Sequence, residues 1–190
     1  DGIRDVAVTE FRRVLFRSIC NLKCRICGSW SSSQFAAEEL KFVDDKKASF
    51  HYAMIKDGAW PRENSQFWTE LEQSLNSIRY LEFTGGEPFL IQEHFELLQT
   101  LVAKGLAKDI EIHYNTNGTQ YPEHAESIWK YFKHVEIAFS IDDVGARFEY
   151  QRTNAVWADV CANINQFKAM RLRNRNITLQ VCCTINIFNV

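Results

Sequence analysis

The segment Cys20-Asn21-Leu22-Lys23-Cys24-Arg25-Ile26-Cys27 holds three cysteines, separated by three and then two residues. Loops this short keep three thiols close together at little cost in chain entropy, so the sulfurs can bind one metal centre. A structural zinc site is closed by four protein ligands. A cubane 4Fe-4S cluster held by three cysteines instead leaves one iron free to bind another molecule. The spacing therefore predicts a 4Fe-4S cluster on Cys20, Cys24 and Cys27.

Two other interpretations of these cysteines stay open on the segment alone. Zinc could take the three thiols together with a distant histidine, as in closed structural sites. Three thiols without any ligand are also tolerated in a reducing compartment. Neither alternative requires the motifs that lie further along the chain, and those motifs favour the cluster.

Length, charge and cysteine content narrow the class of protein. The chain has 190 residues and a formal net charge of -2, which suits one domain with a sizeable core and without a basic stripe for nucleic acid. Six cysteines are too few for a disulfide scaffold, and their clustering favours metal binding in a reducing compartment. There is no apolar run long enough for a membrane span and no evident signal peptide. We therefore expect a cytoplasmic protein without a membrane partner.

A regular alternation of strands and helices is predicted in the second half of the chain. Strands are expected at residues 78–84, 109–116, 135–141 and 177–185, and helices at residues 93–104, 122–132 and 156–170. Two earlier helices are expected, one at residues 32–43 capped by the serines at 31–33, the other capped by Asn64. Strand followed by helix, repeated, is typical of an α/β fold with a parallel sheet.

The strands carry apolar residues on one parity and polar residues on the other. Helices must pack on the apolar parity, which includes Ile137, Phe139 and Cys183. A flat parallel sheet is apolar on both faces, so the polar parity favours an open, partial barrel around a polar ligand. The side chains expected in this concavity are those of Glu82, Glu111, His113, Asn115, Glu136, Ser140, Asp142, Gln180, Cys182 and Thr184.

A glycine-rich segment, Thr84-Gly85-Gly86-Glu87-Pro88, follows the first of these strands. It can be a simple turn with a proline exit. Two glycines also let the backbone approach a ligand closely, and a neighbouring carboxylate can accept a hydrogen bond from an ammonium group. The combination with the three cysteines is far more specific than either motif by itself.

Together the two motifs resemble those of the radical S-adenosylmethionine (radical SAM) enzymes, over residues 19–190. Within that family, the sequence is most similar to those of members with a twitch or SPASM extension. The resemblance implies a partial parallel (β/α) barrel, here ending after about the fifth strand. It implies a 4Fe-4S cluster and S-adenosylmethionine as cofactors, with an electron donor such as flavodoxin or ferredoxin as partner.

For the reaction, the resemblance implies reductive cleavage of S-adenosylmethionine to a 5'-deoxyadenosyl radical. The radical would abstract hydrogen from an unknown substrate, for which the peptide-modifying branch of the family suggests a peptide or protein. The alternative is a non-catalytic iron-sulfur or zinc binding module that lacks the cofactor pocket. Retention of Glu87, Ser140 and Asp142 argues against that alternative.

The resemblance also assigns cofactor contacts, although it assigns no residue to the chemistry on the substrate. The Gly-Gly-Glu segment would hold the methionyl amino group, and Arg152 would pair with the methionyl carboxylate, its alternative being an ordinary surface arginine. Asn115-Thr116-Asn117-Gly118 ends one strand, and Ser140-Ile141-Asp142-Asp143, in which Asp143 replaces the glycine usual in that branch, ends the next. The full predicted set is Gly85, Gly86, Glu87, Asn115, Asn117, Ser140, Asp142 and Arg152.

The other cysteines are not expected to bind a second cluster. Cys161 falls in an apolar helix and is most simply a small core residue. Cys182 and Cys183 are adjacent in a predicted strand, so their side chains point to opposite faces and cannot readily bind one centre.

Residues 1–18 fit this picture least well. The resemblance requires a barrel strand before the cysteines, and residues 12–18 offer only a weak one. Residues 1–17 read like translated sequencing adapter, so we treat the first 18 residues as a doubtful segment of foreign origin. The remaining residues, 19–190, are expected to form a radical SAM core domain that is incomplete at its C-terminal end.

Overall fold

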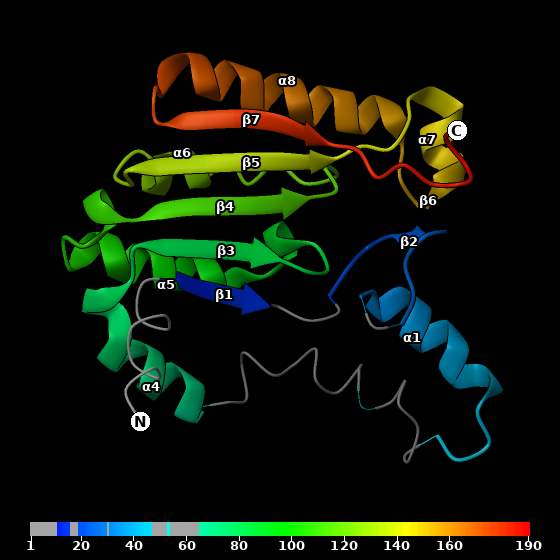
Figure 1. Cartoon of the computed structure of the whole chain (residues 1–190), viewed down its shortest axis with the longest axis horizontal. Coiled ribbons are helices and arrows are strands. Elements are labelled where there is room, and N and C mark those ends of the chain that lie inside the picture. Colours follow the sequence, from blue (N-terminus) through cyan, green and yellow to red (C-terminus); the bar gives the residue numbers. More distant parts are fainter. Residues whose placement is uncertain (1–10, 16–18, 30, 47–52, 54–64) are drawn as a thin grey trace, which may run out of the picture.

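The structure is a computed structural model that describes residues 11–15, 19–29, 31–46, 53 and 65–190. Its centre is a sheet in the order β1-β3-β4-β5-β7, in which every neighbouring pair is parallel (Figure 1). The strands are β1 (Phe11–Leu15), β3 (Tyr80–Thr84), β4 (Glu111–Thr116), β5 (His134–Ser140) and β7 (Ile177–Cys182). The predicted α/β fold with a parallel sheet is confirmed.

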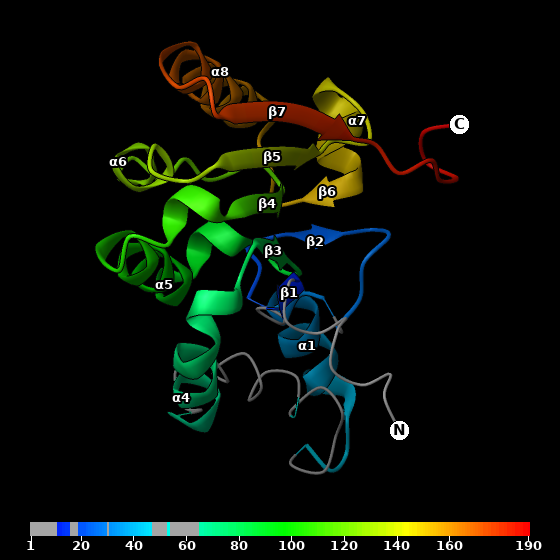
Figure 2. The same cartoon turned by 60° about the vertical axis from the view of Figure 1, so that its left-hand side comes forward.

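Helices cover one face of this sheet, and the hydrophobic core lies between the helices and that face (Figure 2). These are α4 (Ser65–Ser74), α5 (Gln92–Ala103), α6 (Ala125–Trp129) and α8 (Trp157–Arg173). Short 3-10 turns lie at Leu40–Phe42, Leu75–Ser77, Pro88–Leu90 and Ala107–Asp109. The remaining elements, α1 (Ser33–Glu39), β2 (Lys23–Cys24), α7 (Gly145–Gln151) and β6 (Arg152–Thr153), lie toward the carboxyl ends of the strands (Figure 1).

The predicted order of strands and helices from residue 78 onward is confirmed, with ends that differ by a few residues. Ser32 caps α1, its hydroxyl accepting from the backbone N–H of Gln34, and Gly105 ends α5 with a positive φ of 70°. The proposed cap Asn64 lies outside the described residues. Elements α7, β2 and β6 were not predicted, because segments this short carry no recognisable periodicity.

The apolar parity of β3, β4 and β5 faces the helices, as predicted, whereas on β7 Ile177 is buried but Val181 is 62% exposed. The ring of Phe83 lies 4.9 Å from that of His94 on α5. The rings of Tyr114 and Trp129, on β4 and α6, are 5.3 Å apart, as are those of Phe139 and Phe167, on β5 and α8. The polar parity therefore faces the other side of the sheet, which is not covered by α4, α5, α6 or α8 (Figure 2).

Part of the doubtful segment 1–18 forms a strand of the sheet. Residues Phe11–Leu15 pair in parallel with Tyr80–Thr84, at the edge of the sheet. All other residues of the 1–18 segment lie outside the described part, so its foreign origin stays a hypothesis. The closure of the sheet as a partial barrel and the incompleteness of the domain at its C-terminal end also stay predictions.

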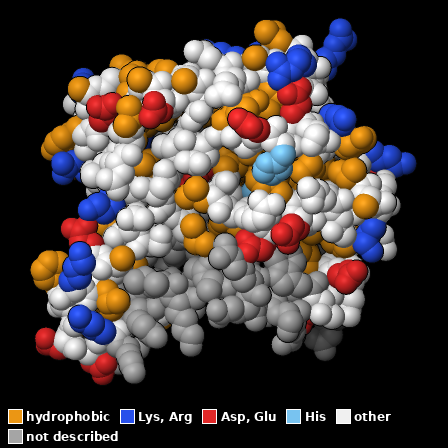
Figure 3. Space-filling view, turned by 180° about the vertical axis from the view of Figure 1, so that it is seen from behind, with side chains coloured by type: hydrophobic (Ala, Val, Ile, Leu, Met, Phe, Trp, Pro, Cys, Tyr) orange, Lys and Arg blue, Asp and Glu red, His pale blue; other side chains and the backbone are white. Residues whose placement is uncertain are grey.

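The molecular surface carries charges of both signs. On the side opposite that of Figure 1, basic and acidic side chains are interspersed with apolar ones over the described part (Figure 3). In the part of the chain that the structure describes, none of the helices is both long and apolar enough to cross a bilayer.

The faces assigned to alternate residues of β5 can be tested by substituting two neighbouring residues. Phe139→Ala should lower the free energy of unfolding by about 3–5 kcal/mol, because it removes a buried ring that packs on Phe167. Ser140→Ala, on the opposite face, should change it by less than about 1 kcal/mol. Urea denaturation of both variants measures the difference, and comparable losses would contradict the assigned register.

Candidate functional site

A cavity of about 430 Å³ lies at the carboxyl ends of the strands. This is the end of a parallel sheet where ligands of α/β proteins bind, and the volume is typical of small-molecule sites. Its walls come from the cysteine segment, the glycine turn, the ends of β3, β4, β5 and β7, and β6. The lining residues are Cys20, Leu22, Cys24, Ile26, Cys27, Ser31, Ser32, Thr84, Gly85, Gly86, Asn115, Thr116, Asn117, Ser140, Arg152, Cys182 and Thr184.

Backbone contacts on two sides hold the cysteine segment in place. Strand β2 pairs antiparallel with β6, so that Cys24 lies opposite Arg152, and the N–H of Arg25 donates to the carbonyl of Gln151 at 2.8 Å. On the other side the hydroxyl of Ser32, the cap of α1, donates to the carbonyl of the fully buried Leu22 at 2.6 Å. The segment is thus fixed between α1 and β6.

The three predicted cluster ligands all line the cavity. A hydrogen bond between the thiols of Cys24 and Cys27 lowers the pKa of Cys27 to about 7. The positive charge of Arg152 also lowers this pKa, whereas burial raises it. The same hydrogen bond and burial raise the pKa of Cys24. Burial raises the pKa of Cys20. The hydrogen bond thus lowers the pKa of Cys27 toward the thiolate form, which is the form that binds metals.

Cysteine thiolates bind both zinc ions and iron-sulfur clusters. Among the described residues, no three His, Cys, Asp or Glu side chains gather closely enough to hold one metal ion. A cubane cluster binds its cysteines through different irons, so its sulfurs surround a larger volume than those of a zinc site. The three thiols that line the cavity supply the sulfur donors that such a centre uses.

The glycine turn packs against the start of the cysteine segment. Gly85 and Gly86 have positive φ angles of 85° and 62°, and both line the cavity. A Cβ placed on Gly86 would overlap the carbonyl oxygen of Ile19. The same carbonyl accepts from the backbone N–H of Glu87 at 2.7 Å. Glycine is needed at position 86 because the chain entering Cys20 lies directly against it.

Glu87 is fully buried and lies behind the cavity wall rather than in it. Its carboxylate accepts from the N–H of Asn117 at 2.7 Å, from the hydroxyl of Thr116 at 2.8 Å and from the N–H of Phe89 at 3.3 Å. Burial raises the pKa of this carboxyl to about 7, although these donors oppose the shift. The structure thus uses Glu87 to join the β3 loop to the β4 loop.

The β4 loop in turn reaches the first cysteine. The amide of Asn117 donates to the side-chain oxygen of Asn21 at 3.0 Å and lies 3.9 Å from the sulfur of Cys20. Asn21 donates to the hydroxyl of Thr119 at 2.8 Å. Asn115 lines the cavity and contacts the ring of His113 at 3.1 Å. Asn21 and Thr119 were not predicted as site residues, since nothing in their sequence context distinguishes them from ordinary loop residues.

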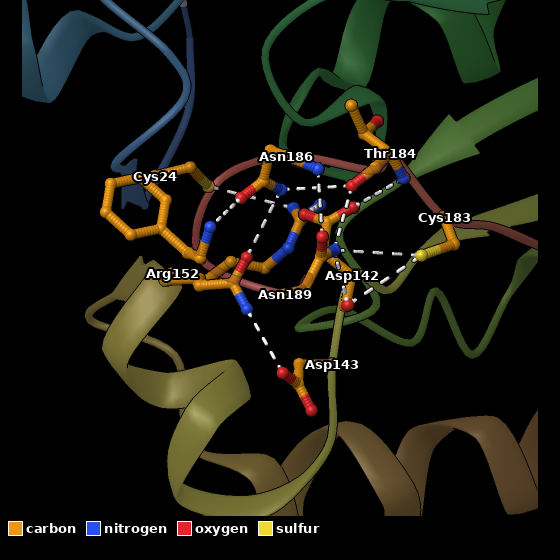
Figure 4. A network of polar contacts seen from close by, with 10 residues as sticks. Cys24, Asp142, Asp143, Arg152, Cys183, Thr184, Asn186 and Asn189 are labelled. Atoms are coloured by element: carbon orange, nitrogen blue, oxygen red, sulfur yellow. Dashed lines mark hydrogen bonds and ion pairs between the residues drawn. The ribbon is translucent and has the colours of Figure 1, made fainter.

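The ends of β5 and β6 supply a buried ion pair. Arg152, only 7 % exposed, donates through Nη2 to the carboxylate of Asp142 at 2.6 Å (Figure 4). The interpretation of Arg152 as a surface arginine is therefore wrong. Asp143 accepts from the N–H of Val144 at 2.8 Å and pairs with Arg147 at 2.9 Å. The left-handed residue of this turn is Gly145, with a φ of 58°, so the turn accommodates Asp143 where the usual glycine would stand.

Most of the predicted cofactor residues meet at this cavity. Glu87 and Asp142 are the two that do not line it, and both contact residues that do. Cys182 lines the cavity while Cys183 does not, in accord with the predicted parity, and Cys161 lies outside it. The predicted residues that line it are Gly85, Gly86, Asn115, Asn117, Ser140 and Arg152.

A parallel α/β sheet whose carboxyl end carries three cysteines around a ligand-sized cavity defines a cofactor-binding domain. The particular family follows from the sequence as a whole, because residues 14–188 match the radical SAM superfamily. The chain belongs to this superfamily of enzymes.

Solved structures share the fold. Native anSMEcpe with bound AdoMet is 22% identical, with a TM-score of 0.54 over 90% of this chain and 43% of its own. Native anSMEcpe with bound AdoMet and the Kp18Cys peptide is 21% identical, with a TM-score of 0.56 over 90% of this chain and 42% of its own. The chain thus spans less than half the length of these proteins. No curated protein matches the sequence.

The close approach of Ile19 to Gly86 predicts that two glycine-to-alanine substitutions reduce stability by different amounts. Gly105→Ala should destabilise by about 1–2 kcal/mol, since φ is positive but a Cβ would meet nothing within 4 Å. Gly86→Ala should cost about 1–3 kcal/mol more, because the new Cβ displaces the backbone at Ile19. Thermal and urea unfolding measure both, and equal losses would contradict the packing described here.

The buried carboxylate of Glu87 predicts a loss of stability on conversion to an amide. Glu87→Gln places an NH2 group against donors that now meet an oxygen, so about 1–3 kcal/mol of the free energy of unfolding should be lost. The matched control Glu96→Gln, on the exposed face of α5, should stay within about 0.5 kcal/mol of the parent. An unchanged Glu87→Gln protein would show that the three hydrogen bonds do not form.

Proposed function

We propose that this chain is the core of a radical SAM enzyme that binds a 4Fe-4S cluster through Cys20, Cys24 and Cys27. The observation that carries the proposal is the meeting of these thiols, the glycine turn and the polar ends of three strands around one cavity. Cluster and S-adenosylmethionine, when bound together, supply a 5'-deoxyadenosyl radical for hydrogen abstraction. The protein's own residues hold, orient and shelter the two cofactors.

The cavity wall offers groups suited to the methionyl end of S-adenosylmethionine. The glycine turn presents backbone atoms without side chains, and Asn115, Asn117 and Ser140 present polar side chains. Arg152 is the cation on the described part of the wall and suits a carboxylate. Glu87 and Asp142 would support these contacts indirectly, Glu87 through the β4 loop and Asp142 through Arg152.

Finer features of the function remain part of the proposal. We assign the protein to the members with a twitch or SPASM extension, with a partial barrel as its core. The substrate would be a peptide or protein, because solved anSMEcpe structures that share the fold include one with a bound peptide. The reaction takes place in the cytoplasm, with a flavodoxin or ferredoxin as electron donor.

The test of the proposal is anaerobic reconstitution of the full-length protein with iron and sulfide. The parent should bind about four irons, show a brown chromophore and release 5'-deoxyadenosine from S-adenosylmethionine only when dithionite is present. Tight zinc binding without a chromophore would overturn the proposal in favour of a structural zinc module. A stable cluster without any 5'-deoxyadenosine would favour the non-catalytic iron-sulfur module instead.

Ligand assignment is tested by single cysteine substitutions. Cys20→Ala, Cys24→Ala and Cys27→Ala should each abolish the chromophore and the bound iron, because each removes one of three ligands. The controls Cys161→Ala and Cys182→Ala should keep both. A Cys182→Ala protein without a cluster, beside a Cys24→Ala protein that keeps it, would contradict the assignment.

A further inference from the structure

The antiparallel ribbon of β2 and β6 places a cation against a predicted cluster ligand. Cys24 and Arg152 are directly opposite each other in this ribbon. Nη1 of the arginine lies 3.7 Å from the sulfur of Cys24, in a contact buried on both sides. Hydrogen bonds and charges at the cysteine sulfurs are among the factors that set the reduction potential of an iron-sulfur cluster.

The guanidinium is fixed in this position by a second charged residue. Asp142 accepts from Nη2 of Arg152 at 2.6 Å, and the two side chains are only 2% and 8% exposed. Its other oxygen accepts from the N–H of Thr184 at 2.9 Å, and its carbonyl accepts from Asn189 at 2.9 Å (Figure 4). The carboxylate therefore cannot turn away, and it orients the arginine fork toward Cys24.

Both terminal nitrogens of the guanidinium already face a partner in the structure. Nη2 is bound to Asp142, Nη1 faces the sulfur, and Nε is buried without a hydrogen-bond partner in the structure. The ring of Phe148 lies 5.8 Å from the guanidinium carbon and covers it from one side. A guanidinium that is only 7% exposed acts more strongly on its neighbours than one in water, because the local dielectric constant is lower.

We propose that Arg152, positioned by Asp142, raises the reduction potential of the cluster through the sulfur of Cys24. This inference rests on the proposed function. Reduction adds a negative charge to the cluster, and the nearby cation stabilises the reduced form. Asp142 has the opposite sign and binds the arginine directly, so it positions the guanidinium and moderates its effect. Arg152 thus serves the cluster as well as the predicted carboxylate of S-adenosylmethionine.

The experiment is a potentiometric titration of the reconstituted full-length protein without S-adenosylmethionine, followed by electron paramagnetic resonance of the reduced cluster. In Arg152→Gln the ratio of reduced to oxidised cluster at a fixed potential should fall roughly tenfold, a shift of about 59 mV for one electron. Asp142→Asn should raise the same ratio, since it removes a negative charge while the amide oxygen still accepts from Nη2 and holds the arginine in place. Arg147→Gln, an exposed arginine paired with Asp143, is the matched control and should leave the ratio unchanged.

Opposite shifts in the two variants support the inference, because a purely structural role of the pair would not give opposite signs. Unchanged ratios, or shifts in the same direction, overturn it. If a single variant fails to assemble a cluster, the neutral pair Asp142→Asn with Arg152→Gln decides: a lowered ratio supports the inference, and a parental ratio overturns it. A parent protein without any 4Fe-4S signal would instead refute the proposed function, and the inference with it.

Discussion

The site depends on one residue, Glu87, which contacts three segments at once. Its backbone N–H holds the carbonyl of Ile19 just before the first cysteine. Its carboxylate holds Thr116 and Asn117 at the end of β4. Because the group is fully buried, each of these hydrogen bonds is protected from competition by water. The cysteine segment, the glycine turn and the β4 loop therefore form a connected wall.

A second connection closes the wall on the opposite side. The ion pair of Asp142 and Arg152 joins the end of β5 to the ribbon that contains Cys24. A buried ion pair is a weak source of stability but a strong constraint on geometry, because either charge would be costly to leave alone. Buried polar contacts thus fix the cavity from two sides, while the apolar core lies on the other face of the sheet.

Much of this arrangement could be predicted from sequence. The alternation of strands and helices gave the sheet, and the parity of residues such as Phe139 and Ser140 gave the face that binds the helices. The cysteine spacing and the glycine turn indicated the site. What could not be predicted depends on contacts between distant segments. Glu87 was expected to contact the cofactor, but its carboxylate is used by a loop about 30 residues away. The β2 and β6 ribbon has too few residues to show any pattern.

The distance along the chain between Cys24 and Arg152 has a consequence for how the protein assembles. Their contact joins residues 128 positions apart, whereas β3, β4 and β5 follow one another closely along the chain. Closing so long a loop is entropically unfavourable until other contacts have shortened it, so we expect the central strands to form first and the cysteine ribbon to dock last. Until it docks, the three thiols are accessible from solvent, so a metal centre can reach them before the contact between Cys24 and Arg152 forms.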